Sequence, residues 1–436
     1  MNPMTGGTRR TEGFLPPAVT RVTFSLVCAI PFLWVARDNP RNLPQDKNDA
    51  YDIRPHVNVK TWDDGGAISR FVYLHSSEVF PAAIIKRSGP VSPIAVKLRP
   101  EIGDFVVDKQ AGADVTLRQT IQNIPLDGFL ILHKGQMVYE QFPRMRTDDR
   151  HLAFSVSKAF TGTLIGILED RKLIDLDKHV DYYLPELAGT NWAASPVRDV
   201  ADMASGVEGV EDSADAYTNP SNKHFLLEAS VGWQPRSGDM PAAVRESDPY
   251  RFLATFKRIH ASGQVQEYAS VNTYVLAEII ERVTGKRLAD VLSSEIWSKM
   301  GAEADGLMLV NERGFAIAHA GMAMTLSDLA RFGLLYTEAS LQSPEDRIIP
   351  EGFLNRLFQK GRPELLGRKA PAWLDHASYQ WDAVGKNREL IKGGFANQLL
   401  YIDCKKDVVI AYFGTNTAVD TVPTRLPLRK LIKQYF

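Results

Sequence analysis

The chain has 436 residues, of which 44% are hydrophobic and 24% are charged, and its formal net charge is −1. This composition is typical of a globular protein, and it supplies no basic excess for nucleic acid or an anionic membrane as main partner. Two cysteines are too few for a disulfide framework, and nine histidines without a His-Glu-x-x-His pattern argue against a zinc hydrolase.

The first 50 residues differ from the rest of the chain and predict an N-terminal extension that ends in a linker. Its apolar run, Val22 to Ala36, is broken by Pro31 and is too short for a membrane span, so no stable span is expected. The run fits the apolar region of a signal peptide better, although Trp34-Val35-Ala36 is a poor cleavage site. Two interpretations stay open: a periplasmic or exported protein, or a cytoplasmic protein whose extension has no targeting role.

The segment before the first predicted hairpin carries no recognisable chemistry. Residues 51–117 contain five prolines and predict loops and short strands around the domain, and residues 115–121 predict a short helix. A hairpin follows, with arms at 128–133 and 136–142 and a turn between them. Because the first arm is almost entirely apolar, we expect it in the middle of a sheet.

Ser155 opens the least polar predicted helix of the chain, and Lys158 follows one turn later. Residues three apart share a helix face, so the two side chains can meet. The helix behind them is apolar on nearly all sides, as in a core, and burial beside the helix N-terminus lowers the pKa of an ammonium group. A neutral lysine beside a serine hydroxyl can make the serine a nucleophile. The pattern also arises by chance, but Ser155 is the only serine with lysine at +3.

A region of predicted helices and polar loops follows the serine helix. Helices are predicted at 197–203, 250–259 and 274–283, the last one capped by Gly285, and from Thr325 through Tyr336. Residues 208–238 form a long polar segment that carries Tyr217 and Trp233. This segment either contacts a substrate or is a solvated linker, and the sequence favours neither interpretation.

The C-terminal part returns to strands. A second hairpin is predicted at 398–402 and 408–413, followed by a basic amphipathic helix. Strands therefore cluster at the two ends of the chain, in a sheet part at about 51–150 and 385–436, with a helical part at about 155–340 between them. This arrangement predicts an α+β domain over residues 51–436, with an antiparallel sheet flanked by helices and a helical insertion.

Several short motifs occur in a recognisable order, and any one of them alone is weak. They are Ser155-Val156-Ser157-Lys158, Asp202-Met203-Ala204-Ser205-Gly206, Tyr268-Ala269-Ser270 and Thr325-Leu326-Ser327-Asp328. Together they resemble the serine β-lactamase and penicillin-binding-protein-like hydrolases, and within them the class C-like esterases and 6-aminohexanoate-dimer hydrolases. The resemblance covers roughly residues 120–415. It implies a β-lactamase/transpeptidase-like fold.

The third motif of the family departs from its usual form. It reads Lys392-Gly393-Gly394, without the threonine that would hold a β-lactam carboxylate, and Ser270 stands where lactamases have an asparagine. Both departures weaken a β-lactamase assignment. The resemblance nevertheless makes Ser270, Lys392 and Gly394 candidates for substrate binding, together with Tyr217 and Trp233 from the polar segment. Lys392 is equally well interpreted as a solvated strand end.

The resemblance implies acyl transfer through a covalent intermediate, without a metal or organic cofactor. Ser155 would attack an ester or amide carbonyl, Lys158 would accept its proton, and Tyr268 would relay a proton to the leaving group. Backbone N–H groups of Ser155 and Phe395 would form the oxyanion hole. We therefore expect a hydrolase of small esters or linear amides. The alternatives are a β-lactamase or D-Ala-D-Ala peptidase, and a non-catalytic binding module of the same fold.

Overall fold

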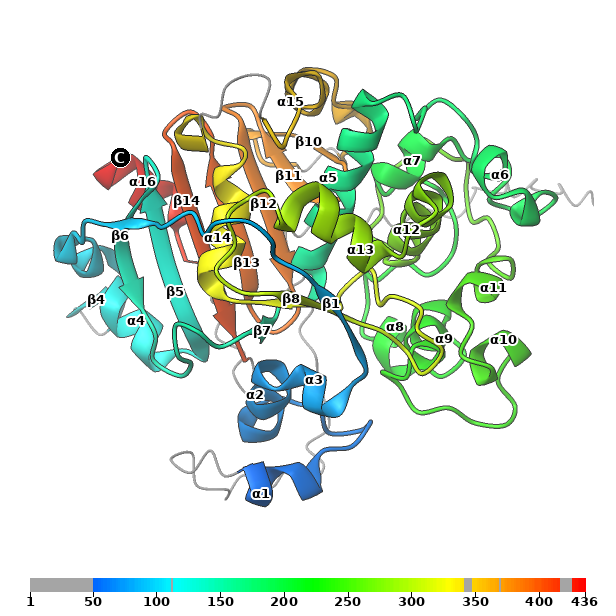
Figure 1. Ribbon diagram of the computed structural model, residues 1–436, viewed down its shortest axis with the longest axis horizontal. Helices are drawn as coiled ribbons and strands as arrows, with labels where there is room; N and C mark the ends of the chain where they lie inside the picture. Colours follow the sequence, from blue (N-terminus) through cyan, green and yellow to red (C-terminus); the bar gives the residue numbers. More distant parts are fainter. Residues whose placement is uncertain (1–49, 111–112, 341–346, 368–369, 416–425) are drawn as a thin grey trace, which may run out of the picture.

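An eight-stranded sheet lies at the centre of the computed structural model, which describes residues 50–110, 113–340, 347–367, 370–415 and 426–436 (Figure 1). Its strands, in spatial order, are β10 (Leu374–Ser378), β11 (Trp381–Gly385), β12 (Glu389–Gly394), β13 (Gln398–Asp403), β14 (Val408–Gly414), β5 (Leu126–His133), β6 (Gln136–Gln141) and β2 (Ala95–Val96). All neighbours are antiparallel except β2 and β6. Both predicted hairpins are confirmed, and the pairing of β14 with β5 joins the two ends of the chain.

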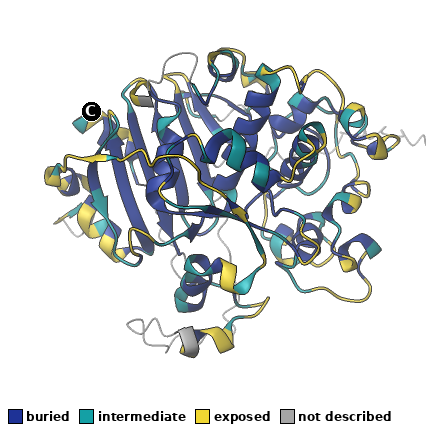
Figure 2. Ribbon diagram, viewed as in Figure 1, coloured by how far each residue is buried: buried dark blue, intermediate teal, exposed yellow. Residues whose placement is uncertain are grey.

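Helices cover both faces of this sheet, which explains why β5 is apolar along nearly its whole length. Phe129 and Ile131 point to the face covered by α4 (Leu117–Asn123) and α16 (Leu428–Tyr435). Leu130 and Leu132 belong to the core on the opposite face, where α14 (Leu326–Leu334) packs. Successive residues of a strand face opposite sides, so a strand in this position needs apolar residues throughout. Figure 2 shows the central strands as buried.

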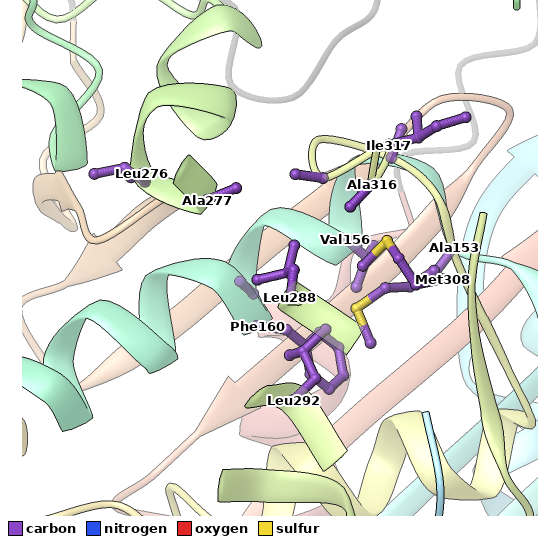
Figure 3. Close-up of a cluster of buried hydrophobic side chains, with 14 of the residues drawn as sticks. Ala153, Val156, Phe160, Leu276, Ala277, Leu288, Leu292, Met308, Ala316 and Ile317 are labelled. Carbon is purple, nitrogen blue, oxygen red and sulfur yellow. The ribbon is translucent and has the colours of Figure 1, made fainter. Parts of the chain in front are cut away.

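The serine helix is α5 (Ser157–Asp170), and it is buried between the sheet and the helical part of the structure. That part contains α7 (Val197–Ala201), α9 (Lys223–Ser230), α11 (Pro249–Leu253), α12 (Val271–Thr284) and α13 (Leu288–Leu292). A second sheet has the order β1 (Ala82–Ile85), β8 (Gly306–Leu309), β9 (Met322–Met324) and β7 (His151–Leu152). Figure 3 shows Phe160 of α5 beside Leu288 and Leu292, so the predicted core position of this helix is confirmed.

The predicted helices with strong local signals are confirmed. The helix predicted at 274–283 is α12, and its cap Gly285 has the left-handed φ of 66°. Thr325 accepts a hydrogen bond from the backbone N–H of Asp328 at the start of α14. The described residues contain no helix that is long and apolar enough to cross a membrane. The predicted signal-like run, Val22 to Ala36, lies outside the described residues.

Four secondary-structure predictions are wrong, and packing or backbone contacts explain the first two. Residues 66–74 form helix α2 rather than loop, because Ile68, Phe71 and Val72 give it a buried stripe. The helix predicted at 250–259 stops at Leu253, because the following residues bond to the 206–208 segment instead.

The other two errors concern strands. The chain is still in strand β4 (Ala113–Thr116) where a helix was expected from residue 115, and a Thr116 capping box then starts α4. The sequence does not predict strands β10 and β11. The C-terminal part of the sheet therefore begins at Leu374 rather than at about residue 385.

Gly162 of α5 leaves no room for a side chain, because an added Cβ would lie 1.8 Å from the carbonyl oxygen of Tyr379. Gly162→Ala is expected to lower the free energy of unfolding by about 3 kcal/mol, because the helix and the sheet would have to move apart. Gly238→Ala is the matched control, since a Cβ there meets no atom within 4 Å. Urea denaturation measures both variants. Wild-type stability in Gly162→Ala would contradict the close packing.

Candidate active site

The serine lies in a tight turn that is fixed to the second sheet. Ser155 occupies a 3-10 turn, Phe154–Val156, directly before α5, and Phe154 has the left-handed φ of 45°. The backbone N–H of Ala153 donates to the carbonyl of Met322 at 2.8 Å, and the Ser157 hydroxyl accepts from the N–H of Met322 at 3.1 Å. A left-handed φ at a non-glycine residue persists only where neighbouring contacts enforce it. The turn holds Ser155 half-buried at the N-terminus of the helix.

The side chain of Lys158 is completely buried and lies against the serine. Its Nζ is 2.8 Å from Oγ of Ser155, and it donates a second hydrogen bond of 3.1 Å to the carbonyl of His319. The ring centroid of Tyr268 is 4.9 Å from the same nitrogen. The shared helix face expected from the spacing of the two residues is therefore observed.

A second buried lysine approaches Tyr268 from strand β12. The Nζ of Lys392 donates to the Tyr268 hydroxyl at 3.3 Å and lies 4.7 Å from its ring centroid. Lys392 forms an ion pair with Asp382 of β11 and has no exposed surface. The interpretation of Lys392 as a solvated strand end is therefore wrong, because the ammonium group is directed into the site.

Glu211 anchors the loop that carries Tyr268. Its backbone N–H donates to the carbonyl of Tyr268 at 2.9 Å, and its carboxylate accepts hydrogen bonds from the N–H of Ser270 and, at 2.9 Å, from the Tyr217 hydroxyl. Burial raises the pKa of Glu211, but the His224 and Lys158 charges and the bonds from Ser270 outweigh it and hold the pKa at about 2. A buried anion thus fixes the Tyr268 loop.

A second buried acid–base pair lies behind Lys158. The His319 imidazole lies 2.6 Å from the Glu228 carboxylate through Nε2 and makes a 3.0 Å hydrogen bond with the Tyr274 hydroxyl through Nδ1. Burial lowers the pKa of His319 against the opposing effect of Glu228. Because the His319 carbonyl accepts a hydrogen bond from Lys158, these contacts fix a polar partner of the lysine.

The remaining predicted residues differ in how they relate to this centre. Ser270 is fully buried and its backbone N–H donates to Glu211, and the Tyr217 hydroxyl donates to the same carboxylate. Trp233 is 3% exposed and packs against Trp62, with a centroid distance of 4.9 Å. Its position makes it part of the aromatic core rather than of an open surface.

Gly394 and Phe395 lie beside the serine turn. A Cβ on Gly394 would lie 2.8 Å from the carbonyl oxygen of Ala153, so glycine is required for this close approach. Phe395 makes an edge contact with Phe154 at a centroid distance of 5.3 Å. The end of β12 therefore reaches the residue next to Ser155.

Sequence reasoning missed four buried charged or titratable groups around the lysines: Glu211, Glu228, His319 and Asp382. None belongs to a short motif. Glu211 and Ser270, and Glu228 and His319, are far apart in the sequence, and Asp382 lies on a strand that was not predicted. In the described part of the chain, no cluster of three or more His, Cys, Asp or Glu side chains could hold a metal ion.

A serine and lysine at the start of a buried helix, beside an antiparallel sheet and a lysine-flanked tyrosine, define the β-lactamase and transpeptidase fold class. The family model described as beta-lactamase matches residues 113–432, and the chain belongs to this family of hydrolases. The resemblance inferred from the motifs and the expected α+β fold are thereby confirmed.

Comparison with individual relatives shows which branch of the family the chain resembles. A 6-aminohexanoate-dimer hydrolase from Paenarthrobacter ureafaciens is 32% identical over 358 residues, which are 81% of this chain and 87% of that protein. The structure of a candidate 6-aminohexanoate-dimer hydrolase from Bacillus anthracis has 26% identity and a TM-score of 0.75, covering 87% of this chain and 95% of that one. A class C beta-lactamase with 14% identity shares the fold, with a TM-score of 0.53 over 73% of this chain and 94% of that one.

The low pKa of Glu211 makes part of the stability pH-dependent. Its folded-state pKa of about 2 lies below the ordinary value of 4.5, so the carboxylate stabilises the fold above pH 4.5 and the effect is lost as pH falls toward 2. Between pH 6 and pH 3 the wild type should lose about 2 kcal/mol that Glu211→Gln does not lose. Urea denaturation across this range provides the measurement.

The matched control for this experiment is Glu364→Gln, which changes an exposed glutamate. It should follow the pH dependence of the wild type. Parallel pH curves for wild type and Glu211→Gln would show that folding does not lower the pKa of this carboxyl group.

Proposed function

We propose that this protein is a serine hydrolase that cleaves a linear amide or a small ester through an acyl-enzyme on Ser155. The observation that carries the proposal is the 2.8 Å contact between Oγ of Ser155 and Nζ of the completely buried Lys158. Burial disfavours the charged form of an amine, and a neutral amine at this distance can accept the hydroxyl proton.

The reaction proceeds in two acyl-transfer steps. Ser155 Oγ attacks the substrate carbonyl while its proton passes to Lys158, and the resulting tetrahedral oxyanion is held by the N–H groups of Ser155 and Phe395. The intermediate collapses as the bond to the amine or alcohol breaks, and the leaving group takes a proton through the Tyr268 hydroxyl. Water then attacks the ester on Ser155, loses its proton through Tyr268 and Lys158, and releases the acid with Ser155 restored.

The contacts of Tyr268 support its role as the proton relay. Its hydroxyl accepts a hydrogen bond from Lys392, and its ring lies within 5 Å of the nitrogens of Lys158 and Lys392. Nearby positive charge stabilises a phenolate, so the tyrosine can release and regain a proton during one turnover. The close approach of Gly394 to Ala153 brings the strand that leads to Phe395 beside the nucleophile.

A linear amide is favoured over a β-lactam by the relatives and by two features of the site. Two 6-aminohexanoate-dimer hydrolases, one of them a candidate, exceed 25% identity to this chain, whereas the class C beta-lactamase at 14% supports the fold only. Ser270 is buried, and Gly393 supplies no hydroxyl at the threonine position. The threonine hydroxyl that would hold a lactam carboxylate and the asparagine amide of the lactamases are thus both missing.

The nucleophile is tested by intact-protein mass spectrometry after exposure to a fluorophosphonate probe or to p-nitrophenyl butyrate. Wild-type protein should gain one adduct, and Ser155→Ala should gain none and lose hydrolysis, with the fold unchanged. Ser88→Ala, at an exposed serine outside the site, is the matched control and should still be labelled. A folded wild type without an adduct would overturn the serine-hydrolase proposal and favour a non-catalytic binding module.

The substrate class is tested by comparing three compounds: the linear 6-aminohexanoate dimer, p-nitrophenyl butyrate and benzylpenicillin. We expect kcat/KM for the dimer or the ester to exceed that for the β-lactam by at least about 100-fold, a few kcal/mol of transition-state binding. Product release is followed by chromatography for the amide and by absorbance for the other two. Preferential turnover of benzylpenicillin would reverse the assignment in favour of a β-lactamase.

A further inference from the structure

Asp382 lies directly opposite Lys392 on the neighbouring strand. The pairing of Ala383 with Ile391 fixes the register of β11 and β12, and one step further along it places Asp382 across from Lys392. One oxygen of its carboxylate forms the ion pair with the lysine, and the other accepts the backbone N–H of Gly393 at 2.8 Å. The carboxylate is therefore occupied on both oxygens by groups of β12.

Lys392 depends on this contact because it has no access to solvent. Its side chain has no exposed surface, whereas the side chain of Asp382 is 13% exposed. A buried ammonium group without a counter-charge is strongly destabilised and tends to lose its proton. With the carboxylate in place, the Lys392 ammonium is paired and directs a hydrogen bond to the Tyr268 hydroxyl.

We propose that Asp382 is a positioning residue of the active site, which keeps Lys392 protonated and aimed at Tyr268. Through its second oxygen it also holds the backbone of Gly393, two residues before Phe395. The inference rests on the proposed function, because it assigns Asp382 a role in the same reaction. Asp382 touches neither substrate nor the reacting atoms in this mechanism, and it acts through Lys392 and the end of β12.

The groups around Lys392 suit a lysine that stays charged. Asp382 faces it from β11, Tyr268 faces it from the loop before α12, and the residue opposite it on β13 is the apolar Leu400. The Nζ of Lys158 is also near the Tyr268 ring, and the carboxylate that interacts with Lys158 is that of Glu211. A fixed charge on Lys392 disfavours a second one on Lys158, so the two lysines can take different roles.

Asp382→Asn tests the proposal through the pH dependence of p-nitrophenyl butyrate hydrolysis. Without the counter-charge, Lys392 should lose its proton at lower pH, so the alkaline limb of the kcat/KM profile should move down by at least one pH unit. At pH 8, kcat should fall 10-fold or more with little change in KM, because Lys392 acts on Tyr268 rather than on substrate binding. Asp382→Glu, which restores the charge, should recover much of the alkaline limb.

A double variant separates a positioning role from a merely structural one. In a Lys392→Met background, Asp382→Asn should neither move the alkaline limb further nor lower kcat more than twofold, because its target is already absent. The same double variant removes both charges together, and it keeps the test available if Asp382→Asn alone fails to fold. If Asp382→Asn lowered kcat as strongly in the Lys392→Met background as in the wild type, the proposal would be overturned.

The fluorophosphonate adduct distinguishes failure of this inference from failure of the proposed function. If wild-type Ser155 is labelled and a folded Asp382→Asn keeps the wild-type pH profile, Asp382 has no positioning role and the serine hydrolase stands. If wild-type Ser155 is not labelled, the proposed function fails first, and the role of Asp382 fails with it.

Discussion

The site depends on one constraint, which is that an amine without access to water must be satisfied by fixed polar partners. Lys158 finds two of them, Oγ of Ser155 and the carbonyl of His319. Each partner is itself held in place, the serine by the turn bonded to β9 and the carbonyl by the contacts of the His319 ring with Glu228 and Tyr274. The precise placement of a reactive side chain thus comes from contacts one layer further into the protein.

Charge balance explains the composition of the layer around Tyr268. Two buried lysines approach one aromatic ring, which would be unfavourable if they were the only charges there. Asp382 pairs with Lys392, and the buried Glu211 interacts with Lys158 and holds both ends of the Tyr268-to-Ser270 segment. The two carboxylates therefore have similar functions. Each lies near one lysine and also fixes a piece of backbone.

How much the sequence could predict depends on how local each contact is. Ser155 and Lys158 could be predicted because residues three apart at the start of a helix bring their side chains together. Helix α12 could be predicted because Gly285 caps its end. Asp382 could not be found, because its role depends on the register of β11, a strand with only five residues and no clear turn signal. Glu211 lies 59 positions from Ser270, and no local pattern links residues at that separation.

The two departures from the lactamase motifs have a common structural consequence. At the third motif, the N–H of Gly393 is already used by Asp382, and the residue has no side chain to offer a substrate. At the second motif, Ser270 is buried, and its N–H is used by Glu211. Both positions are thus turned toward internal carboxylates rather than toward a ligand. Beside Ser155, the ring contact of Phe154 with Phe395 ties the end of β12 to the serine turn instead.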